Sequence, residues 1–569
     1  MLSKTKLFNY ITAPQKDKPI HIGLLFCIVW CLLFVLYYPA AKAGFVTDFT
    51  GWLDQVKNHG FWEYVNRTNF HARSLYQFTQ LVTYFFYKLF GINAWLWHLL
   101  FITLHSINAC LVFIFCSCLL DDTDVANGKM IALFGVLLFC VSPYLSEVIV
   151  WEPSFHFLQG LLLIMLILLF VQRFVHTGAQ KYAWMAGVIY FLSTFSLEVF
   201  YVTPWLILTL GIFYRYTPSF DKKMFSRVVK FFFIPMLSLF ALRFAAFHIF
   251  YGSWVSRIGT ETVTLINFQS FGKPAKYLFH LLFIGRFFPN DIRQQVYSFC
   301  DSTLGIILFY SIITVICAII VARFRNMSGK GRVACLLFVF VMITLALLIP
   351  IWFRETLLVM FDRYIYFTAP FFYVLFAVLI SAIPKQNVRI VIILVYTLIN
   401  LRFAIMVSRY WSKSARVIHE LLNNIPDAGN KTIILLNLPE CLNGTPMIGS
   451  EKESEYKLMH NLLLPDKKID NTVYDVLSYN MQTPDDGAHV TVANDSTIHV
   501  TLNQWGTWWW YEGKGGYNYE NKDYKLNVID AGHWYELTLK KPTEQYLLLY
   551  EVGDKWKIVD MGKKNVDQD

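Results

Sequence analysis

The chain has 569 residues, of which 56% are hydrophobic and 18% aromatic, with a net charge of +10 and a mean hydropathy of +0.45. This composition is too apolar for a soluble enzyme and is typical of a protein that crosses a membrane many times. The basic excess does not indicate nucleic-acid binding, because Lys and Arg at membrane edges mainly set helix orientation. Most of the 10 cysteines lie in apolar runs without a CxxC pair, so neither a disulfide framework nor a zinc site is expected.

Eleven apolar segments are candidates to cross a membrane, a task that takes about 20 residues per helix. The first follows a polar stretch without a small-residue cleavage site, which indicates a cytoplasmic tail before an uncleaved helix. In chain order the segments are 21–38, 94–120, 130–146, 155–171, 182–195, 201–214, 231–250, 304–322, 333–352, 364–383 and 390–407.

The distribution of Lys and Arg tests this assignment. The basic loops all fall on one side of the membrane if residues 74–90 form an amphipathic helix at the outer interface rather than a span. That helix then belongs to a first external loop, 40–93, and a second external loop covers 251–302. The second loop carries another amphipathic stretch around Arg286. A short twelfth span there is the alternative, and it would break the charge pattern.

The composition changes after residue 410. The stretch 411–569 is polar, contains turn signals such as PDAGN and PDDG, and shows alternating runs that predict strands. The predicted strands are 432–437, 488–492, 497–502, 534–539 and 545–551. The fold class expected is therefore an α-helical polytopic membrane domain, 1–410, followed by a small, mostly β external domain with an α/β start. The aromatic run at 505–524 could bind sugar, although a β-domain core with a membrane-facing rim is the favoured interpretation.

The first 120 residues carry an ordered set of short motifs. They read FVTDF at 45–49, HARSL at 71–75, LFGIN at 89–93 and ITLHSINA at 102–109. In this order they resemble the GT-C superfamily of membrane glycosyltransferases, most closely its transmembrane O-mannosyltransferase branch, and the resemblance covers roughly the first 410 residues. It implies a GT-C-like fold of about eleven helices. It also implies inverting transfer of a sugar from a polyprenyl-phosphate-linked donor on the external face of the membrane.

Such a reaction needs a general base, a cation for the phosphate leaving group and an apolar groove for the lipid. Asp48 stands where the family places its acid and is the candidate catalytic base; a helix N-cap is the alternative. Arg363, in the FDRYIYF motif, is the first candidate for the donor phosphate, beside Tyr364. Arg73 and Arg286 are further candidates for that role.

Other polar and aromatic side chains are expected to line the substrate site. Glu147 and Trp151 match the family pattern after the third span, but Ser142 and Leu145 replace its two histidines, so a metal site stays unknown. The substrate-lining candidates are His71, Tyr76, Glu147, Trp151, Glu198 and Arg243. For both glutamates a structural role, such as a salt bridge at a helix end, stays open.

The predicted function is thus that of a GT-C-type glycosyltransferase, with a protein, glycan or lipid acceptor and no nucleic-acid partner. No cofactor is certain, and a divalent metal is possible. The expected location is a bacterial inner membrane with the catalytic loops and the C-terminal domain in the periplasm, or else the endoplasmic reticulum membrane with these parts in the lumen. A lipid or solute transporter and a non-catalytic membrane scaffold with an external binding domain are the alternatives.

Overall fold

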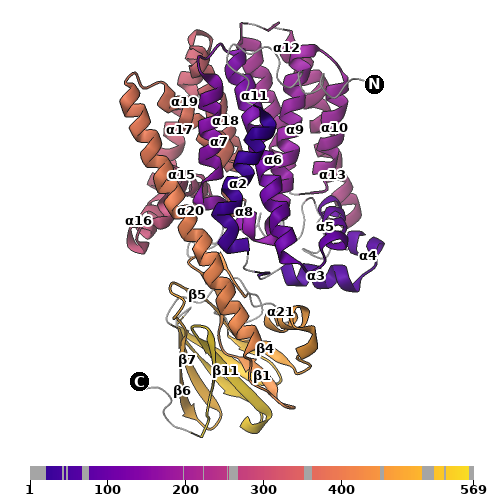
Figure 1. Ribbon diagram of the computed structural model, residues 1–569, viewed down its shortest axis with the longest axis vertical. Helices are drawn as coiled ribbons and strands as arrows, with labels where there is room; N and C mark the ends of the chain where they lie inside the picture. The colour runs from indigo at the N-terminus through magenta and orange to yellow at the C-terminus, as the bar shows by residue number, and fades with distance from the viewer. Residues whose placement is uncertain are drawn as a thin grey trace.

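A helical bundle and a β-rich C-terminal region make up the molecule, with one long helix running between them (Figure 1). The computed structural model describes residues 21–41, 44–46, 49–66, 76–196, 198–218, 220–221, 223–252, 254, 267–350, 362–448, 454–502, 518–530 and 534–562. Asp48, His71 and Arg73 lie outside the described residues. The coarse architecture expected from the sequence, a polytopic helical part followed by a β-rich part, is confirmed.

Seven helices of the described residues are long and apolar enough to cross a membrane. They are α2 (Ile22–Ala41), α6 (Ala94–Asp122), α9 (Phe155–Thr177), α13 (Ile234–Tyr251), α17 (Thr303–Arg323), α18 (Gly329–Ala346) and α20 (Gln386–Asn423). An eighth span results if α7 (Gly128–Cys140) is taken together with the segment Pro143–Val150, from which it is bent by 55°. Shorter helices complete the bundle, namely α10 (Lys181–Ser193), α11 (Thr203–Tyr216) and α19 (Ala369–Ser381). The count of eleven spans therefore stays a prediction.

The bundle has a tightly packed centre and two helices that stand at its margin. Helix α6 packs against α2, α7 and α9, and α7 packs against α19. Gly135 allows the close contact between α7 and α19, because a Cβ at this position would lie 2.7 Å from the Cα of Val374. By contrast, only 17% of the span containing α13 and 11% of that containing α17 is buried. These two helices, like α20, of which 17% is buried, turn most of their apolar surface away from the rest of the bundle.

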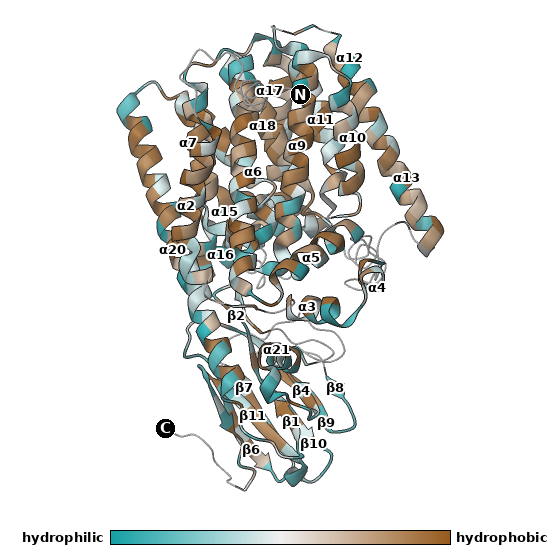
Figure 2. Ribbon diagram, turned by 45° about the vertical axis from the view of Figure 1, so that its right-hand side comes forward, coloured by the Kyte–Doolittle hydropathy of each residue, from teal (hydrophilic) through white to brown (hydrophobic). Residues whose placement is uncertain are grey.

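The connecting helices at one end of the bundle lie next to the β-rich region. They include α3 (Phe49–Asn58), α4 (Phe61–Asn66), α5 (Gln77–Phe90), α15 (Lys273–Phe283) and α16 (Asn290–Asp301). Helix α12 (Met224–Val228) lies at the opposite end (Figures 1 and 2). Neither α5 nor α15 qualifies as a span. The placement of these helices on the external side of the membrane stays a prediction.

Helix α20 passes through the predicted domain boundary at 410/411 without a break. Its sequence contains neither Gly nor Pro, so nothing in the backbone ends the helix before Asn423. The polar change of composition marks where the helix leaves the bundle and enters the C-terminal region (Figure 2). The division of the chain into two domains stays a prediction.

The C-terminal strands form three sheets. The first has the order β12-β11-β1-β4, in which β1 (Thr432–Leu435) runs parallel to β4 (Val473–Asp475) and β11 (Tyr546–Val552), as an α/β start requires. The second is antiparallel with the order β6-β7-β10-β9-β8, and the third has the order β3-β2-β5. The remaining elements are β2 (Leu438–Leu442), β3 (Thr445–Pro446), α21 (Glu455–Leu463), β5 (Ser478–Met481), β6 (Ala488–Asn494), β7 (Thr497–Leu502), β8 (Tyr519–Glu520), β9 (Tyr524–Asp530), β10 (Trp534–Leu539) and β12 (Lys555–Ile558). The five predicted strands are confirmed, with shifts of one or two residues at their ends.

Candidate functional site

The candidate site is built around the break that follows α7. Pro143 disfavours a helical conformation for Ser142, whose backbone is extended, so α7 ends and a short turn η1 (Pro143–Leu145) begins. Helix α8 (Ser146–Val150) and a second proline turn, η2 (Glu152–Ser154), follow before α9 starts. This broken path places a buried acid, Glu147, and its neighbours at the end of the bundle that carries the β-rich region.

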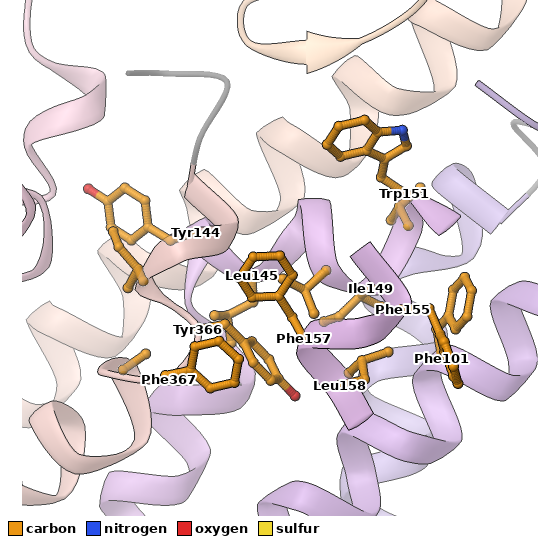
Figure 3. Close-up of a cluster of buried hydrophobic side chains, with 14 of the residues drawn as sticks. Phe101, Tyr144, Leu145, Ile149, Trp151, Phe155, Phe157, Leu158, Tyr366 and Phe367 are labelled. Atoms are coloured by element: carbon orange, nitrogen blue, oxygen red, sulfur yellow. The ribbon is translucent and has the colours of Figure 1, made fainter. Parts of the chain in front are cut away.

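An aromatic cluster holds the break in place (Figure 3). Phe157 of α9 stacks on Phe367 with ring centroids 5.4 Å apart, and Phe101 of α6 lies 5.9 Å from Phe155. The Phe157–Phe367 contact fixes the turn at residues 362–368, which contains the FDRYIYF motif from Asp362 onward, beside α9. Two segments more than 200 positions apart in the chain are thereby brought together.

The first ion pair of the site joins these two segments. Arg363 Nη1 lies 3.0 Å from Glu147 Oε2, and the backbone N–H of Arg363 donates to the same oxygen at 3.3 Å. The guanidinium also lies over the rings of Trp151, 4.6 Å from its centroid, and Tyr364, at 5.0 Å. Four residues predicted for the site from the sequence therefore meet in one buried cluster. The cation–π contacts add to the ion pair because desolvation strengthens both.

A second ion pair adjoins the first. Arg286, in the turn η6 (Gly285–Phe287), donates through Nη1 to Asp362, the residue directly before Arg363. Both side chains are buried. Burial raises the pKa of Asp362, while the Arg286 guanidinium opposes that rise and the nearby Glu147 adds to it. We call the cluster of Glu147, Arg286, Asp362 and Arg363 the charged centre.

A histidine that was not among the predicted site residues completes the charged centre on one side. His280 of α15 bonds through Nε2 to the hydroxyl of Tyr297, and its Nδ1 lies 3.8 Å from Asp362 Oδ1. Burial lowers the pKa of His280 to about 3, and the positive charge of Arg293 contributes further. His280 is therefore neutral near pH 7. The signal in the sequence was its position six residues before Arg286, in the amphipathic stretch predicted there.

Each carboxyl group of the charged centre has one oxygen without a hydrogen-bond partner among the described residues. Glu147 Oε1 and Asp362 Oδ1 are buried and have no hydrogen-bond partner among the described residues. Buried polar atoms are normally hydrogen-bonded, so such exceptions mark places where a ligand or water can bind. The charged centre thus combines two guanidinium groups with acceptor atoms that a hydroxyl group could satisfy.

Two lysines add positive charge on the side of α15. Lys276 is buried and paired with Asp301, and Lys273 donates to the carbonyl of Ile349 at 3.1 Å. Burial lowers the pKa of Lys273 to about 8, with a further contribution from Lys276, whereas Asp301 acts in the opposite direction. The segment from α15 to α16 therefore brings basic groups close to the N-terminal end of α17.

A second buried polar pair lies near the same helix break. His98 Nε2 of α6 is 3.6 Å from Glu152 Oε1, and neither side chain is exposed. Neither oxygen of Glu152 makes a hydrogen bond among the described residues. Glu152 was not predicted as a site residue; its place beside Trp151 was the available signal.

Deeper in the bundle, α6 supplies a polar network of a structural kind. The Tyr366 hydroxyl lies 2.8 Å from His105 Nδ1 and accepts from Asn108 Nδ2 at 3.1 Å. Asn108 also donates to the carbonyl of Leu158 at 3.0 Å. These bonds tie α6 to α9 and to the turn at 362–368, so they fix the backbone that carries Asp362 and Arg363.

The remaining predicted residues are placed as follows. Tyr76 is half-buried and directly precedes α5. Glu198 begins a short turn, η3 (Glu198–Tyr201), but its side chain is outside the described part. Arg243 of α13 donates through Nε to the carbonyl of Thr194 at the end of α10, at 3.2 Å. Its described contacts therefore hold α13 against α10.

A metal site is not apparent in the described part of the chain. No group of three or more His, Cys, Asp or Glu side chains converges there in a way that could hold a metal ion. The possible divalent metal therefore has no ligand set among these residues, and no chemical step is assigned to it.

No family model and no curated protein matches the chain. Among solved structures, it is similar to the crystal structure of the apo form of the Archaeoglobus fulgidus oligosaccharyltransferase, with 13% identity and a TM-score of 0.38. The match covers 74% of this chain and 62% of that chain. A similarity at this level carries no argument for function, which rests on the site itself.

The fold and the site together define the class of protein. It is an integral membrane protein with a helical bundle, a β-rich C-terminal region and a buried charged centre at the end of the bundle where the two meet.

Proposed function

We propose that the chain is a GT-C-type glycosyltransferase that takes a sugar from a polyprenyl-phosphate-linked donor and transfers it to a protein, glycan or lipid acceptor. The observation that carries the proposal is the pair of buried guanidinium groups, Arg286 and Arg363, at one end of an apolar bundle. Burying such charges costs free energy, so a buried arginine is expected to be paired with an acid or to have a function. Here each has a carboxylate partner that leaves one oxygen unbonded.

The donor phosphate is assigned to these two guanidinium groups. A guanidinium has five N–H donors in a planar fork that matches phosphate oxygens. The described hydrogen bonds of Arg286 use two of its donors. The phosphate would therefore bind beside the ion pairs, with Lys273 and Lys276 adding to the positive potential.

The lipid tail is assigned to the lipid-facing surface near α17. That helix is apolar along its length and nearly unburied, and its outer end meets α16. A polyprenyl chain lying along it would remain in the bilayer while its phosphate reached the basic segment between α15 and α16. The lipid would thus need no enclosed cavity.

The proposed chemistry is a single inverting displacement. The acceptor oxygen attacks the anomeric carbon, the bond from this carbon to the phosphate oxygen breaks, and the polyprenyl phosphate leaves with the electron pair. Asp48 is proposed to take the proton of the acceptor hydroxyl. In the sequence it directly precedes Phe49, the first residue of α3, and α3 lies at the end of the bundle next to the β-rich region. This end is proposed to face the periplasm of a bacterial inner membrane, or alternatively the lumen of the endoplasmic reticulum.

Transfer of radiolabel from polyprenyl-phosphate sugars in purified membranes tests the proposal, with mass spectrometry of the copurified lipid to select the donor. We predict that Asp48→Asn lowers kcat by about 10²–10⁴-fold while donor binding stays nearly intact, because a base acts mainly in the transition state. Arg323→Ala, at the exposed end of α17, serves as the control.

Full turnover by a folded Asp48→Asn variant would remove Asp48 from the mechanism. It would direct the search for the acid to Glu147 or Glu198. Lack of transfer by the wild type with every polyprenyl-phosphate sugar would favour the scaffold alternative, in which the ion pairs of the charged centre are structural.

A further inference from the structure

The C-terminal region reaches the charged centre through the tip of one hairpin. Strands β2 and β3 are joined by Asn443 and Gly444, whose φ angles are +49° and +77°. Positive φ at both positions of a two-residue Asn-Gly loop is the type I′ geometry, which suits the twist of a hairpin. The carbonyl of Asn443 accepts a hydrogen bond from Arg286 Nη2 at 2.6 Å.

The hairpin itself is firmly held. Asn443 donates through its backbone N–H to Met481 at 2.9 Å and through its side chain to the carbonyl of Gln482 at 2.5 Å. Strand β2 is buried along its whole length and pairs in parallel with β5. Because the groups around it are fixed by these bonds, the Asn443 carbonyl presents a rigid acceptor to Arg286.

Arg286 is constrained from the other side as well. Its Nη1 bonds to Asp362, and its backbone carbonyl accepts from Arg293 Nη1 at 2.8 Å. The preceding Gly285 packs closely against Phe279, since a Cβ there would lie 2.2 Å from a ring carbon of Phe279. The guanidinium therefore bonds on one side to Asp362 of the membrane bundle and on the other side to the neutral carbonyl of Asn443 in the C-terminal region.

This arrangement changes how Arg286 pairs with its acid. An unconstrained arginine and carboxylate often form two parallel hydrogen bonds, which uses both ends of the fork. Here Nη2 is taken by the Asn443 carbonyl, and Asp362 Oδ1 has no hydrogen-bond partner among the described residues. With Nη2 bonded to the hairpin, the described ion pair has a single hydrogen bond, and the neutral carbonyl adds no charge that would repel an anion.

We infer that the Asn443–Gly444 hairpin is a positioning element that prepares Arg286 to bind an anionic phosphate group. The C-terminal region is then a component of the anion-binding centre rather than a separate binding module. A second contact supports this role, because Thr50 of α3 donates to Glu455 of α21 at 2.8 Å in a buried position. The inference rests on the proposed function, in which the phosphate belongs to a polyprenyl donor.

Binding of a polyprenyl phosphate to the purified full chain in detergent micelles tests the inference. Gly444→Val places a β-branched residue at φ +77° and should displace the carbonyl of Asn443. Gly429→Val makes the same change at φ +51° in an open turn before β1 and is the matched control. We expect Gly444→Val to weaken binding about tenfold relative to the control, and kcat to change less than the apparent donor KM.

A double-mutant cycle makes the test specific. If the hairpin acts through Arg286, Gly444→Val should add no further loss of affinity in an Arg286→Ala background. Equal affinities of the two glycine variants, or additive losses in the cycle, would overturn the inference while the proposed function stands. A wild type that fails to bind polyprenyl phosphate would overturn both. Circular dichroism and thermal unfolding confirm that each variant compared is folded.

Discussion

The charged centre and the His98–Glu152 pair lie near the same helix break and are both buried, yet they hold their acids differently. In the charged centre, Glu147 and Asp362 are each bonded to an arginine. At the other pair, Glu152 makes no hydrogen bond among the described residues and has a histidine 3.6 Å away. The two arginines of the charged centre stay charged at every pH of interest. The His98–Glu152 pair has no permanent charge, and it is neutral overall when the histidine and the acid together hold one titratable proton.

The difference shows which buried acids can serve an anionic ligand. An arginine cannot lose its proton, so the charged centre keeps positive groups at every pH of interest. The His98–Glu152 pair has no such permanent cation. For this reason the donor phosphate is assigned to the charged centre, and neutralising substitutions should cost much more stability there than at the His98–Glu152 pair.

The largest expected effect comes from breaking one ion pair of the charged centre. Glu147→Leu leaves Arg363 buried without its partner and should lower the free energy of unfolding by about 3–5 kcal/mol. The double variant Glu147→Leu with Arg363→Met removes both charges and should recover most of that loss. Thermal unfolding in detergent measures both. A single variant as stable as the wild type would show that Arg363 finds another partner.

A smaller effect is expected on donor binding. Arg363→Ala should weaken binding of a polyprenyl phosphate by about 1.5–3 kcal/mol, the range for a hydrogen bond to a charged group. Arg363→Lys should restore only part of this, because a point charge replaces a planar fork. Calorimetric titration of the folded variants measures the affinities. Full recovery with lysine would mean that only the charge of Arg363 matters.

A third buried acid sharpens the comparison, because its partners are neutral. Glu551 of β11 bonds to the Tyr479 hydroxyl and to Asn437, and burial raises its pKa well above the ordinary value. The folded state therefore favours the protonated form. The contribution of Glu551 to stability is complete below its unfolded-state pKa of about 4.3 and is lost as pH rises toward its folded-state pKa.

The Glu551→Gln variant should remove this dependence. The wild type should lose up to about 1.4 kcal/mol of unfolding free energy per pH unit from this group, and the variant should not. The cleanest measurement uses a fragment from Asn423 to Asp569, which we predict to be soluble and β-rich by circular dichroism. Parallel pH profiles of the two proteins would show that Glu551 is ionised in the folded state. A disordered fragment would contradict the proposed domain division.

The smallest effect is expected at the His98–Glu152 pair. Glu152→Gln keeps the shape of the side chain and removes no hydrogen bond seen in the structure, so the free energy of unfolding should change by less than about 1 kcal/mol. Unfolding in detergent, alongside Glu147→Gln as a matched acid-to-amide change, checks this. A loss as large as that at Glu147 would show that the two clusters are equivalent and that His98 acts as a cation.

Much of the fold could be predicted from local patterns in the sequence. The long apolar runs indicate the bundle, and alternating residues predict strands such as Thr497–Leu502 and Trp534–Leu539, whose limits agree with the structure. These patterns are local because each helix or strand must bury its own apolar face. The end of α20 was not predicted. The composition changes at residue 410, but this change does not end a helix that lacks Gly and Pro, and α20 continues to Asn423.

For the site, the sequence by itself determined that arginines and acids would lie in apolar surroundings near helix ends. Arg363, Tyr364, Glu147 and Trp151 were singled out through the resemblance of their motifs to the GT-C superfamily, and the structure brings them together. The pairing of Arg286 with Asp362, the place of His280 and the contact of Asn443 with Arg286 were decided only by the tertiary structure. Each depends on segments separated by 76 to 157 positions. No local pattern specifies such pairs, because their distances follow from how the break after α7, the external helices and the C-terminal hairpin pack against one another.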